Sequence, residues 1–152
     1  MRLKDKSVII TGGGSGIGLA CTQLFCNEGA QVAIIGRRKK LLESTAKEIG
    51  TQVLPVAGDL TKNSDLDMLV SKTLKKFGKI DVVINNGGLF TGSPIHETKD
   101  EDWDTVLDVN LGAAFRLTRA CLRGMMKKRW GRVIGITSIV GVTGNPGQAN
   151  YA

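Results

Sequence analysis

Short apolar runs alternate with stretches of helical periodicity along the whole chain. Five of these runs are bounded by glycine or polar residues, which predicts strands at 7–11, 31–35, 53–56, 81–84 and 132–137. Such an alternation of strands and helices predicts parallel strands, right-handed crossovers and helices on both faces of the sheet. The sequence therefore predicts an α/β fold, a doubly wound parallel sheet built as one domain over residues 1–152.

The helices between these strands are predicted from apolar stripes and start signals. The first ends at Gly29 and carries a stripe of Ile17, Ala20, Cys21, Leu24 and Phe25. Two capping boxes, Ser64 with Asp67 and Thr98 with Glu101, predict where two later helices begin. The second of these is the longest helix, running to about Lys128, with a core-facing stripe of Trp103, Leu107, Asn110, Ala114, Leu117 and Cys121.

Composition is that of a soluble globular protein, with 41% hydrophobic and 23% charged residues. No apolar run approaches the length of a membrane span, and the N-terminus lacks the apolar core of a signal peptide. These features predict a cytoplasmic protein without a membrane partner. The three cysteines form no CxxC pair and are interpreted as small apolar residues, so neither a metal site nor a disulfide is expected.

The net charge of +7 raises the question of a nucleic-acid partner. Basic residues cluster at 37–40 and 127–129, but aromatic residues make up only 5% of the chain and none interleave these clusters. A polyanionic cofactor, an acidic protein partner or a generally basic surface is favoured over nucleic acid.

Glycine and polar residues follow every predicted strand. Ligands of open parallel sheets bind beyond the carboxyl ends of the strands, so these residues are expected to meet around one long polar ligand. The five strand exits read Thr11-Gly12-Gly13-Gly14-Ser15-Gly16-Ile17-Gly18, Gly36-Arg37-Arg38, Gly58-Asp59-Leu60, Asn85-Asn86-Gly87-Gly88 and Thr137-Ser138.

The first exit has the spacing T-G-x-x-x-G-x-G, which differs from the G-x-G-x-x-G dinucleotide fingerprint. Its glycines permit a tight turn and a close backbone approach, and the helix that follows presents its N-terminus to a pyrophosphate. A simple structural turn is the alternative. The position between the first strand and a well-formed helix favours dinucleotide binding.

The second exit bears on which dinucleotide is bound. An acidic residue here would bond the ribose 2′-hydroxyl of NAD, but the chain has Gly36 and then Arg37. A guanidinium group binds phosphate in a bidentate fork, so Arg37 and Arg38 favour NADP(H). The alternative is that both arginines are solvated residues at the start of a helix.

Three further residues are candidates for chemistry. Asn110 is a poor helix former within a helical stripe, so its amide either makes a structural hydrogen bond or orients a water or backbone group at an active site. Ser138 ends the fifth strand and Tyr151 follows thirteen residues later. Neither Ser138 nor Tyr151, taken alone, indicates a function.

Together these residues resemble the short-chain dehydrogenase/reductase family over the whole chain. The resemblance is carried by Thr11-Gly12-x-x-x-Gly16-x-Gly18, Asp59, Asn85-Asn86-Gly87-Gly88, Asn110, Ser138 and Tyr151. Within that family, the stretches 123–132 and 144–151 are similar to 3-oxoacyl-[acyl-carrier-protein] reductases, which reduce 3-oxoacyl thioesters with NADPH and are usually tetramers.

The resemblance implies roles for the candidate residues. Ser138 would bond the substrate carbonyl, Tyr151 would donate the proton, and Asn110 would hold a water in a proton relay. Arg129 would dock an acidic acyl carrier protein. The cofactor would be held by Gly12, Ser15, Gly16, Ile17, Gly18, Arg37, Arg38, Asp59, Leu60, Asn86, Gly87 and Tyr151, with Asp59 and Leu60 at the adenine and Asn86 and Gly87 at the ribose.

The chain departs from the family pattern at two places. Gly87 stands where the family usually has alanine, and the sequence given ends at Ala152, before the lysine of the Tyr-x-x-x-Lys motif. The resemblance therefore implies negligible reductase activity for these 152 residues alone. A sugar, polyol or hydroxysteroid dehydrogenase, and a non-catalytic nucleotide-binding fragment completed by another polypeptide, remain as alternatives.

Overall fold

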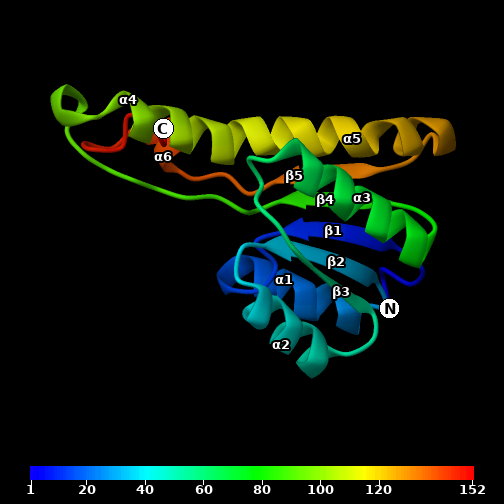
Figure 1. Cartoon of the computed structure of the whole chain (residues 1–152). Coiled ribbons are helices and arrows are strands. Elements are labelled where there is room, and N and C mark those ends of the chain that lie inside the picture. Colours follow the sequence, from blue (N-terminus) through cyan, green and yellow to red (C-terminus); the bar gives the residue numbers. More distant parts are fainter.

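A computed structural model describes all 152 residues of the chain. Five parallel strands form one sheet in the order β3-β2-β1-β4-β5 (Figure 1). Their bounds are β1 Ser7–Thr11, β2 Gln31–Gly36, β3 Val53–Ala57, β4 Val82–Asn85 and β5 Arg132–Gly135. The predicted α/β doubly wound class and all five predicted strands are confirmed.

Helices cover both faces of this sheet. Helices α1 (Gly16–Asn27) and α2 (Lys39–Ile49) lie on one face, and α3 (Asn63–Phe77) and α5 (Ala113–Lys128) lie on the other (Figure 1). Helix α4 (Asp100–Leu107) leads into α5 through a π-helical turn, η2 (Asp108–Gly112). Two shorter elements are the 3₁₀ turn η1 (Ile95–Glu97) and α6 (Val140–Thr143). No helix combines the length and the apolar character needed to span a membrane.

Strands β1 to β4 are largely apolar because both faces of this part of the sheet are covered, whereas β5 is exposed along its length. Ile9 of β1 belongs to the core cluster formed with α3 and α5, which includes Leu69 and Leu117. Its neighbours Val8 and Ile10 belong to the opposite cluster, formed with α1 and α2. Alternation along β1 thus supplies both cores, since successive side chains of a strand point to opposite faces.

Both predicted capping boxes are wrong. Helix α3 begins at Asn63, and the Ser64 hydroxyl lies 3.4 Å from an Asp65 carboxylate oxygen instead of accepting from a helix N–H. Helix α4 begins at Asp100, and the Thr98 hydroxyl donates to the Pro94 carbonyl oxygen at 3.1 Å. The first turn of α4 is acidic, so it is stabilised by the helix dipole without a side-chain cap.

The longest predicted helix is interrupted by η2, which changes its buried face. A π-helical turn holds an extra residue, so the apolar stripe is displaced around the helix axis where it passes this turn. Trp103 and Leu107, both expected in the core, are 40% and 37% exposed, and Val106 is buried instead. Beyond η2 the predicted Leu117 and Cys121 are buried, but Ala113 is buried in place of Ala114, which is half-buried.

The predicted stripe of α1 is also partly wrong. Ile17 and Leu24 are 61% and 52% exposed, whereas the small residues Gly18, Thr22 and Cys26 are buried. The Thr22 hydroxyl lies 3.1 Å from the Gly13 carbonyl oxygen and 2.8 Å from that of Gly18. Small residues on this face allow α1 to approach the glycine turn that precedes it.

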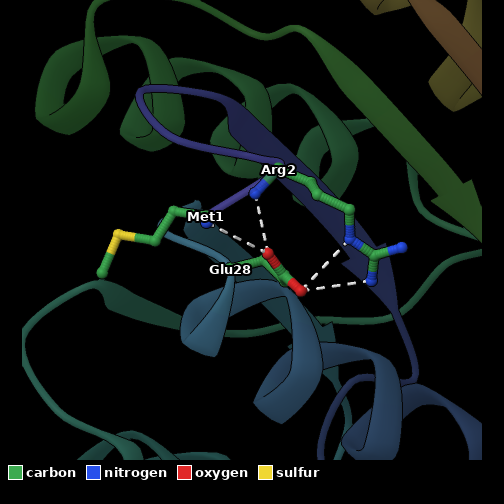
Figure 2. Close-up of polar contacts among 3 residues, drawn as sticks. All are labelled: Met1, Arg2 and Glu28. Atoms are coloured by element: carbon green, nitrogen blue, oxygen red, sulfur yellow. Dashed lines mark hydrogen bonds and ion pairs between the residues drawn. The ribbon is translucent and has the colours of Figure 1, made fainter.

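Glu28, just after α1, holds the N-terminus of the chain (Figure 2). Its carboxylate accepts from the Arg2 backbone N–H at 2.7 Å and pairs with the Arg2 guanidinium at 3.1 Å. The hydrogen bond from the Arg2 backbone and the Arg2 charge lower the pKa of Glu28 against a smaller opposing effect of burial. The segment before β1 is thereby fixed against the end of α1.

Asp81 connects three elements at the amino-terminal edge of the sheet. Its carboxylate, 5% exposed, accepts from the Ser7 backbone N–H at 3.0 Å and lies 3.2 Å from Lys79 Nζ and 3.6 Å from Lys128 Nζ. Burial by itself raises the pKa of Asp81, but the Ser7 hydrogen bond and the two lysines outweigh it, so that the net pKa is lowered.

Two of the three cysteines are buried, as their interpretation as apolar residues predicted. Burial raises the pKa of Cys26 to about 11 and that of Cys121 to about 12, so both thiols are protonated at neutral pH.

Candidate active site

Two adjoining cavities lie at the carboxyl edge of the sheet. The first, of about 610 Å³, is lined by the loops that follow β1, β2, β3 and β4. The second, of about 960 Å³, lies between the loop after β4, the η2 turn and residues 136–152. Gly87, Gly88 and Leu89 line both cavities, and we call these three residues the shared wall. A ligand in the first cavity therefore reaches the second along the exit of β4.

The glycine turn after β1 has the close packing that its sequence predicts. Gly12 and Gly16 have positive φ angles of 67° and 52°, which favour glycine. A Cβ atom on Gly18 would overlap the Gly12 carbonyl oxygen, so the first turn of α1 lies directly against the exit of β1. Because α1 begins at Gly16, its free N–H groups face this exit, where an anionic group is stabilised.

Arg37 and Arg38 line the first cavity together with Ser15. The Arg38 guanidinium donates to the Ser15 hydroxyl at 3.0 Å, which draws the arginine toward the glycine turn. The positive charge lies beyond the end of β2, where a nucleotide on this turn would extend. These residues fit a dinucleotide that carries an additional phosphate.

Asp59 and Leu60 form another part of the first cavity. Asp59 Oδ1 accepts from the backbone N–H and the hydroxyl of Thr61, at 3.0 and 2.9 Å, and these two bonds are the main reason that the pKa of Asp59 is lowered. Leu60 reaches the shared wall, since a Cβ atom on Gly87 would stand 2.6 Å from Leu60 Cδ1. The space that an alanine at 87 would occupy is filled by Leu60.

Asn110 lies within η2 and holds the loop after β4. Its Oδ1 accepts from the Leu89 N–H at 2.9 Å, and its Nδ2 donates to the Leu89 carbonyl oxygen at 2.8 Å. Of the roles expected from the sequence, the structure thus shows Asn110 orienting a backbone group. The side chain lines the second cavity and is half-buried, not enclosed in the core.

Ser138 and Tyr151 line the same second cavity as Asn110. Ser138 Oγ accepts from the Val140 N–H at 3.3 Å, which leaves the hydroxyl hydrogen of Ser138 to donate to a ligand. The Tyr151 ring packs edge-to-face against Phe90, with ring centroids 5.4 Å apart. The three residues expected to do chemistry are therefore brought into one cavity from three separate parts of the chain.

The structure places the predicted cofactor residues in the first cavity, in the second cavity or outside both. Seven of them line the first cavity: Gly12, Ser15, Arg37, Arg38, Asp59, Leu60 and Gly87. Ile17 and Asn86 line the second cavity, while Gly18 is buried below the turn. Gly16 lines neither cavity, and its place is the exposed start of α1.

Arg129 is not brought to either cavity. It follows the last residue of α5, in a left-handed conformation with φ of 51°, and its side chain is exposed. Helix α5 has 16 residues, so its length of about 24 Å separates Arg129 from η2. Arg129 therefore lies outside both cavities, at the end of α5 opposite to η2.

Phe90 helps to build the site and was not singled out from the sequence, whereas Thr11 was named only as part of the glycine motif. Thr11, the last residue of β1, accepts hydrogen bonds from the backbone after β4, and Phe90 contacts Tyr151. The motif did not predict this role of Thr11. For Phe90, the sequence signal is an aromatic residue two positions after a glycine pair, in a chain with few aromatic residues.

Comparison with known proteins agrees with this site. The model of the family described as short chain dehydrogenase matches residues 6–152. The 3-oxoacyl-[acyl-carrier-protein] reductase FabG of Thermotoga maritima is 41% identical over 155 residues, which cover 100% of this chain and 63% of the relative. Nodulation protein G of Rhizobium sp. strain N33 is 41% identical, covering 98% of this chain and 61% of the relative.

The reductase of the same name from Escherichia coli K12 is 34% identical over 152 residues, covering 100% of this chain and 62% of the relative. The chain thus spans somewhat less than two thirds of the length of these curated relatives. The glycine turn, the two cavities and the match over 6–152 lead to one conclusion: the chain belongs to the short-chain dehydrogenase family.

Proposed function

We propose that this chain is the cofactor-binding and catalytic portion of an NADPH-dependent reductase that acts on the keto group of 3-oxoacyl thioesters. The single observation that carries the proposal is that the cavity lined by Ser138 and Tyr151 adjoins the arginine-lined cavity along the shared wall. A dinucleotide lying along that wall would bring its nicotinamide end to the substrate. When bound, NADPH supplies the hydride.

Different residues of the first cavity bind different parts of NADPH. The glycine turn and the N-terminus of α1 receive the pyrophosphate, and Arg37 and Arg38 receive the 2′-phosphate. Asp59 and Leu60 flank the adenine. Asn86 and Gly87 line the ribose nearer the substrate, where Asn86 Nδ2 donates to the Thr11 carbonyl oxygen at 2.9 Å and is fixed in place.

The residues of the second cavity act on the keto group. The Ser138 hydroxyl donates a hydrogen bond to the carbonyl oxygen, where negative charge develops as hydride arrives. Tyr151 donates its phenolic proton to the alkoxide that forms. Asn110 holds the water that returns a proton to Tyr151, in addition to fixing Leu89.

The substrate class is supported by the walls of the second cavity and by the names of the relatives. Phe90, Leu111 and Val142 line this cavity with exposed apolar surface, which suits an acyl chain beside a polar keto group. Arg129, together with Lys127 and Lys128, presents positive charge at the end of α5 for an acidic acyl carrier protein.

The oligomeric state belongs to the same proposal. Helices α4 and α5 and the η2 turn between them carry exposed apolar residues, which are Trp103, Leu107, Leu111, Phe115, Leu122 and Met126. An apolar surface of this kind is typical of a protein interface. It supports self-association, and the assembled form that we propose is the homotetramer usual for 3-oxoacyl-[acyl-carrier-protein] reductases.

The test is NADPH consumption in the presence of an acetoacetyl thioester. Because the chain covers 63% of the T. maritima relative, it is assayed alone and after the C-terminal part of a reductase relative is supplied. We expect negligible turnover by the chain alone and NADPH oxidation by the completed protein, with Tyr151→Phe slower by about 10²–10⁴-fold. Oxidation of polyols with NADP⁺ in place of thioester reduction would contradict the substrate assignment, and failure to bind NADPH would contradict the whole proposal.

A further inference from the structure

Phe90 and Tyr151 are in direct contact inside the second cavity. Their ring centroids are 5.4 Å apart and their planes meet at 64°, an edge-to-face arrangement. This is a preferred geometry for aromatic pairs, whose energy depends on orientation beyond the area that they bury. The contact joins the loop after β4 to the last residues of the chain.

Phe90 is itself held on two sides. The backbone of Leu89, the preceding residue, is bonded through both its N–H and its carbonyl group to the Asn110 amide, at 2.9 and 2.8 Å. The ring lies directly against Gly92, because a Cβ atom at Gly92 would overlap Phe90 Cζ and would stand 2.7 Å from the Gly147 carbonyl oxygen. The backbone directly before Phe90 is thus fixed, and one side of the Phe90 ring lies against Gly92.

Tyr151, in contrast, has no polar contact that orients its ring. Its backbone N–H donates to the Gln148 carbonyl oxygen at 3.0 Å, which places the residue but not the side chain. The phenolic oxygen has no hydrogen-bond partner within the chain, and the residue is half-buried. The staggered χ1 rotamers of a tyrosine place its hydroxyl in widely separated positions, so the packing of its ring selects among them.

We propose that Phe90 is a positioning residue. Its place is set by the hydrogen bonds between Asn110 and Leu89, and its packing against the Tyr151 ring orients the phenolic oxygen toward the substrate. This inference rests on the proposed role of Tyr151 as the proton donor. It gives Asn110 a second effect on the reaction, exerted through Phe90 rather than through water.

Tyr151 is the only tyrosine of the chain, so protein made with ring-¹³C-labelled tyrosine gives the signals of this residue alone. The measurement is the χ1 rotamer of Tyr151, from three-bond couplings, together with ring-to-ring nuclear Overhauser effects. Phe90→Leu removes the ring and keeps an apolar side chain, and Phe90→Trp restores an aromatic ring. Phe77→Leu, at the last residue of α3 and outside both cavities, makes the same exchange.

We expect one χ1 rotamer in the unmodified chain, in Phe90→Trp and in Phe77→Leu, and averaging over rotamers in Phe90→Leu. In the completed reductase, kcat for Phe90→Leu should fall about threefold to tenfold, the equivalent of an aromatic-pair contribution, with KM for NADPH unchanged. Phe90→Trp should recover most of this loss.

An unaltered Tyr151 rotamer in Phe90→Leu, or equal effects of Phe90→Leu and Phe77→Leu, would overturn the positioning role while thioester reduction continued. A completed protein that reduces no thioester would instead overturn the proposed function, and the χ1 measurement would still decide whether Phe90 orients Tyr151.

Discussion

The hydroxyl of Thr11 accepts a hydrogen bond from the Gly87 N–H at 2.7 Å and thereby fixes the wall between the two cavities. The same oxygen accepts from the Asn86 N–H at 2.9 Å, so one side chain at the end of β1 satisfies two backbone donors beyond the end of β4. Thr11 is 3% exposed, and water cannot replace it. The site is therefore built on a pairing between the exits of two adjacent strands.

Replacing Thr11 by valine keeps the shape of the side chain and removes the acceptor. Two backbone N–H groups would lose their partner, and each unsatisfied donor costs about 1–3 kcal/mol. We expect Thr11→Val to lower the free energy of unfolding by about 2–4 kcal/mol and to weaken NADPH binding. Urea unfolding measures the first effect, and Thr11→Ser, which keeps the hydroxyl, is the control. A valine variant as stable as the unmodified chain would show that the hydroxyl contributes nothing.

Arg37 and Arg38 are expected to select the phosphorylated dinucleotide. A hydrogen bond to a charged group contributes about 1.5–3 kcal/mol, so the double change Arg37→Ala, Arg38→Ala should raise the Kd of NADPH by roughly 10–100-fold and leave that of NADH nearly unchanged. Fluorescence titration of both cofactors measures this. Lys40→Ala removes a nearby exposed charge that lies outside the cavity and serves as the control. Equal weakening of NADPH and NADH would refute phosphate selection.

Gly87 and Leu60 are expected to be coupled. An alanine methyl group at 87 would stand 2.6 Å from Leu60 Cδ1, so Leu60 must move toward the first cavity. We expect Gly87→Ala to raise the Kd of NADPH severalfold while costing only about 1 kcal/mol of stability, because the displaced atom is the end of a flexible side chain. The double variant Leu60→Val, Gly87→Ala should recover the affinity. Strictly additive effects of the two changes would argue against contact between them.

Asp81 is expected to make stability sensitive to acid. The pKa of Asp81 is lowered in the folded protein, so its contribution to stability is complete above about pH 4 and is lost as the pH falls through the lowered pKa. Asp81→Asn should cost about 1–3 kcal/mol at neutral pH and should reduce the loss of stability on acidification. Urea unfolding between pH 7 and strongly acidic pH measures both effects. Asp104→Asn, on the exposed surface of α4, is the control and should change neither.

Much of this architecture is contained in local sequence patterns. The strands were predictable because both faces of a parallel sheet are buried, which makes each strand an apolar run with a sharp end. The residues lining the first cavity were predictable because the carboxyl ends of parallel strands lie at the same edge of the sheet. Ser138 and Tyr151 were singled out by their resemblance to a family motif, because neither has a distinctive local pattern of its own.

The remaining features depend on contacts between distant residues. The η2 turn was missed because the helical periodicity on each side of it is intact, and only an asparagine and a glycine within five residues mark the break. The stripe of α1 was misassigned because Ile17 was expected to pack inward, whereas the space against β1 admits only Gly18. The Phe90–Tyr151 contact joins residues in loops without periodicity, so no local pattern indicates it.

The central position of β1 also sets the order in which the sheet is completed during synthesis. One edge of β1 pairs with β2, which follows almost at once along the chain, but the other edge pairs with β4, whose partner residues are more than seventy positions later. Until β4 has left the ribosome, a strand with the apolar centre Val8-Ile9-Ile10 presents an unpaired edge. Such an edge is a template for pairing between nascent chains. The interval between β1 and β4 is therefore the stage at which this chain is most exposed to aggregation, and chaperone binding during that interval would protect it.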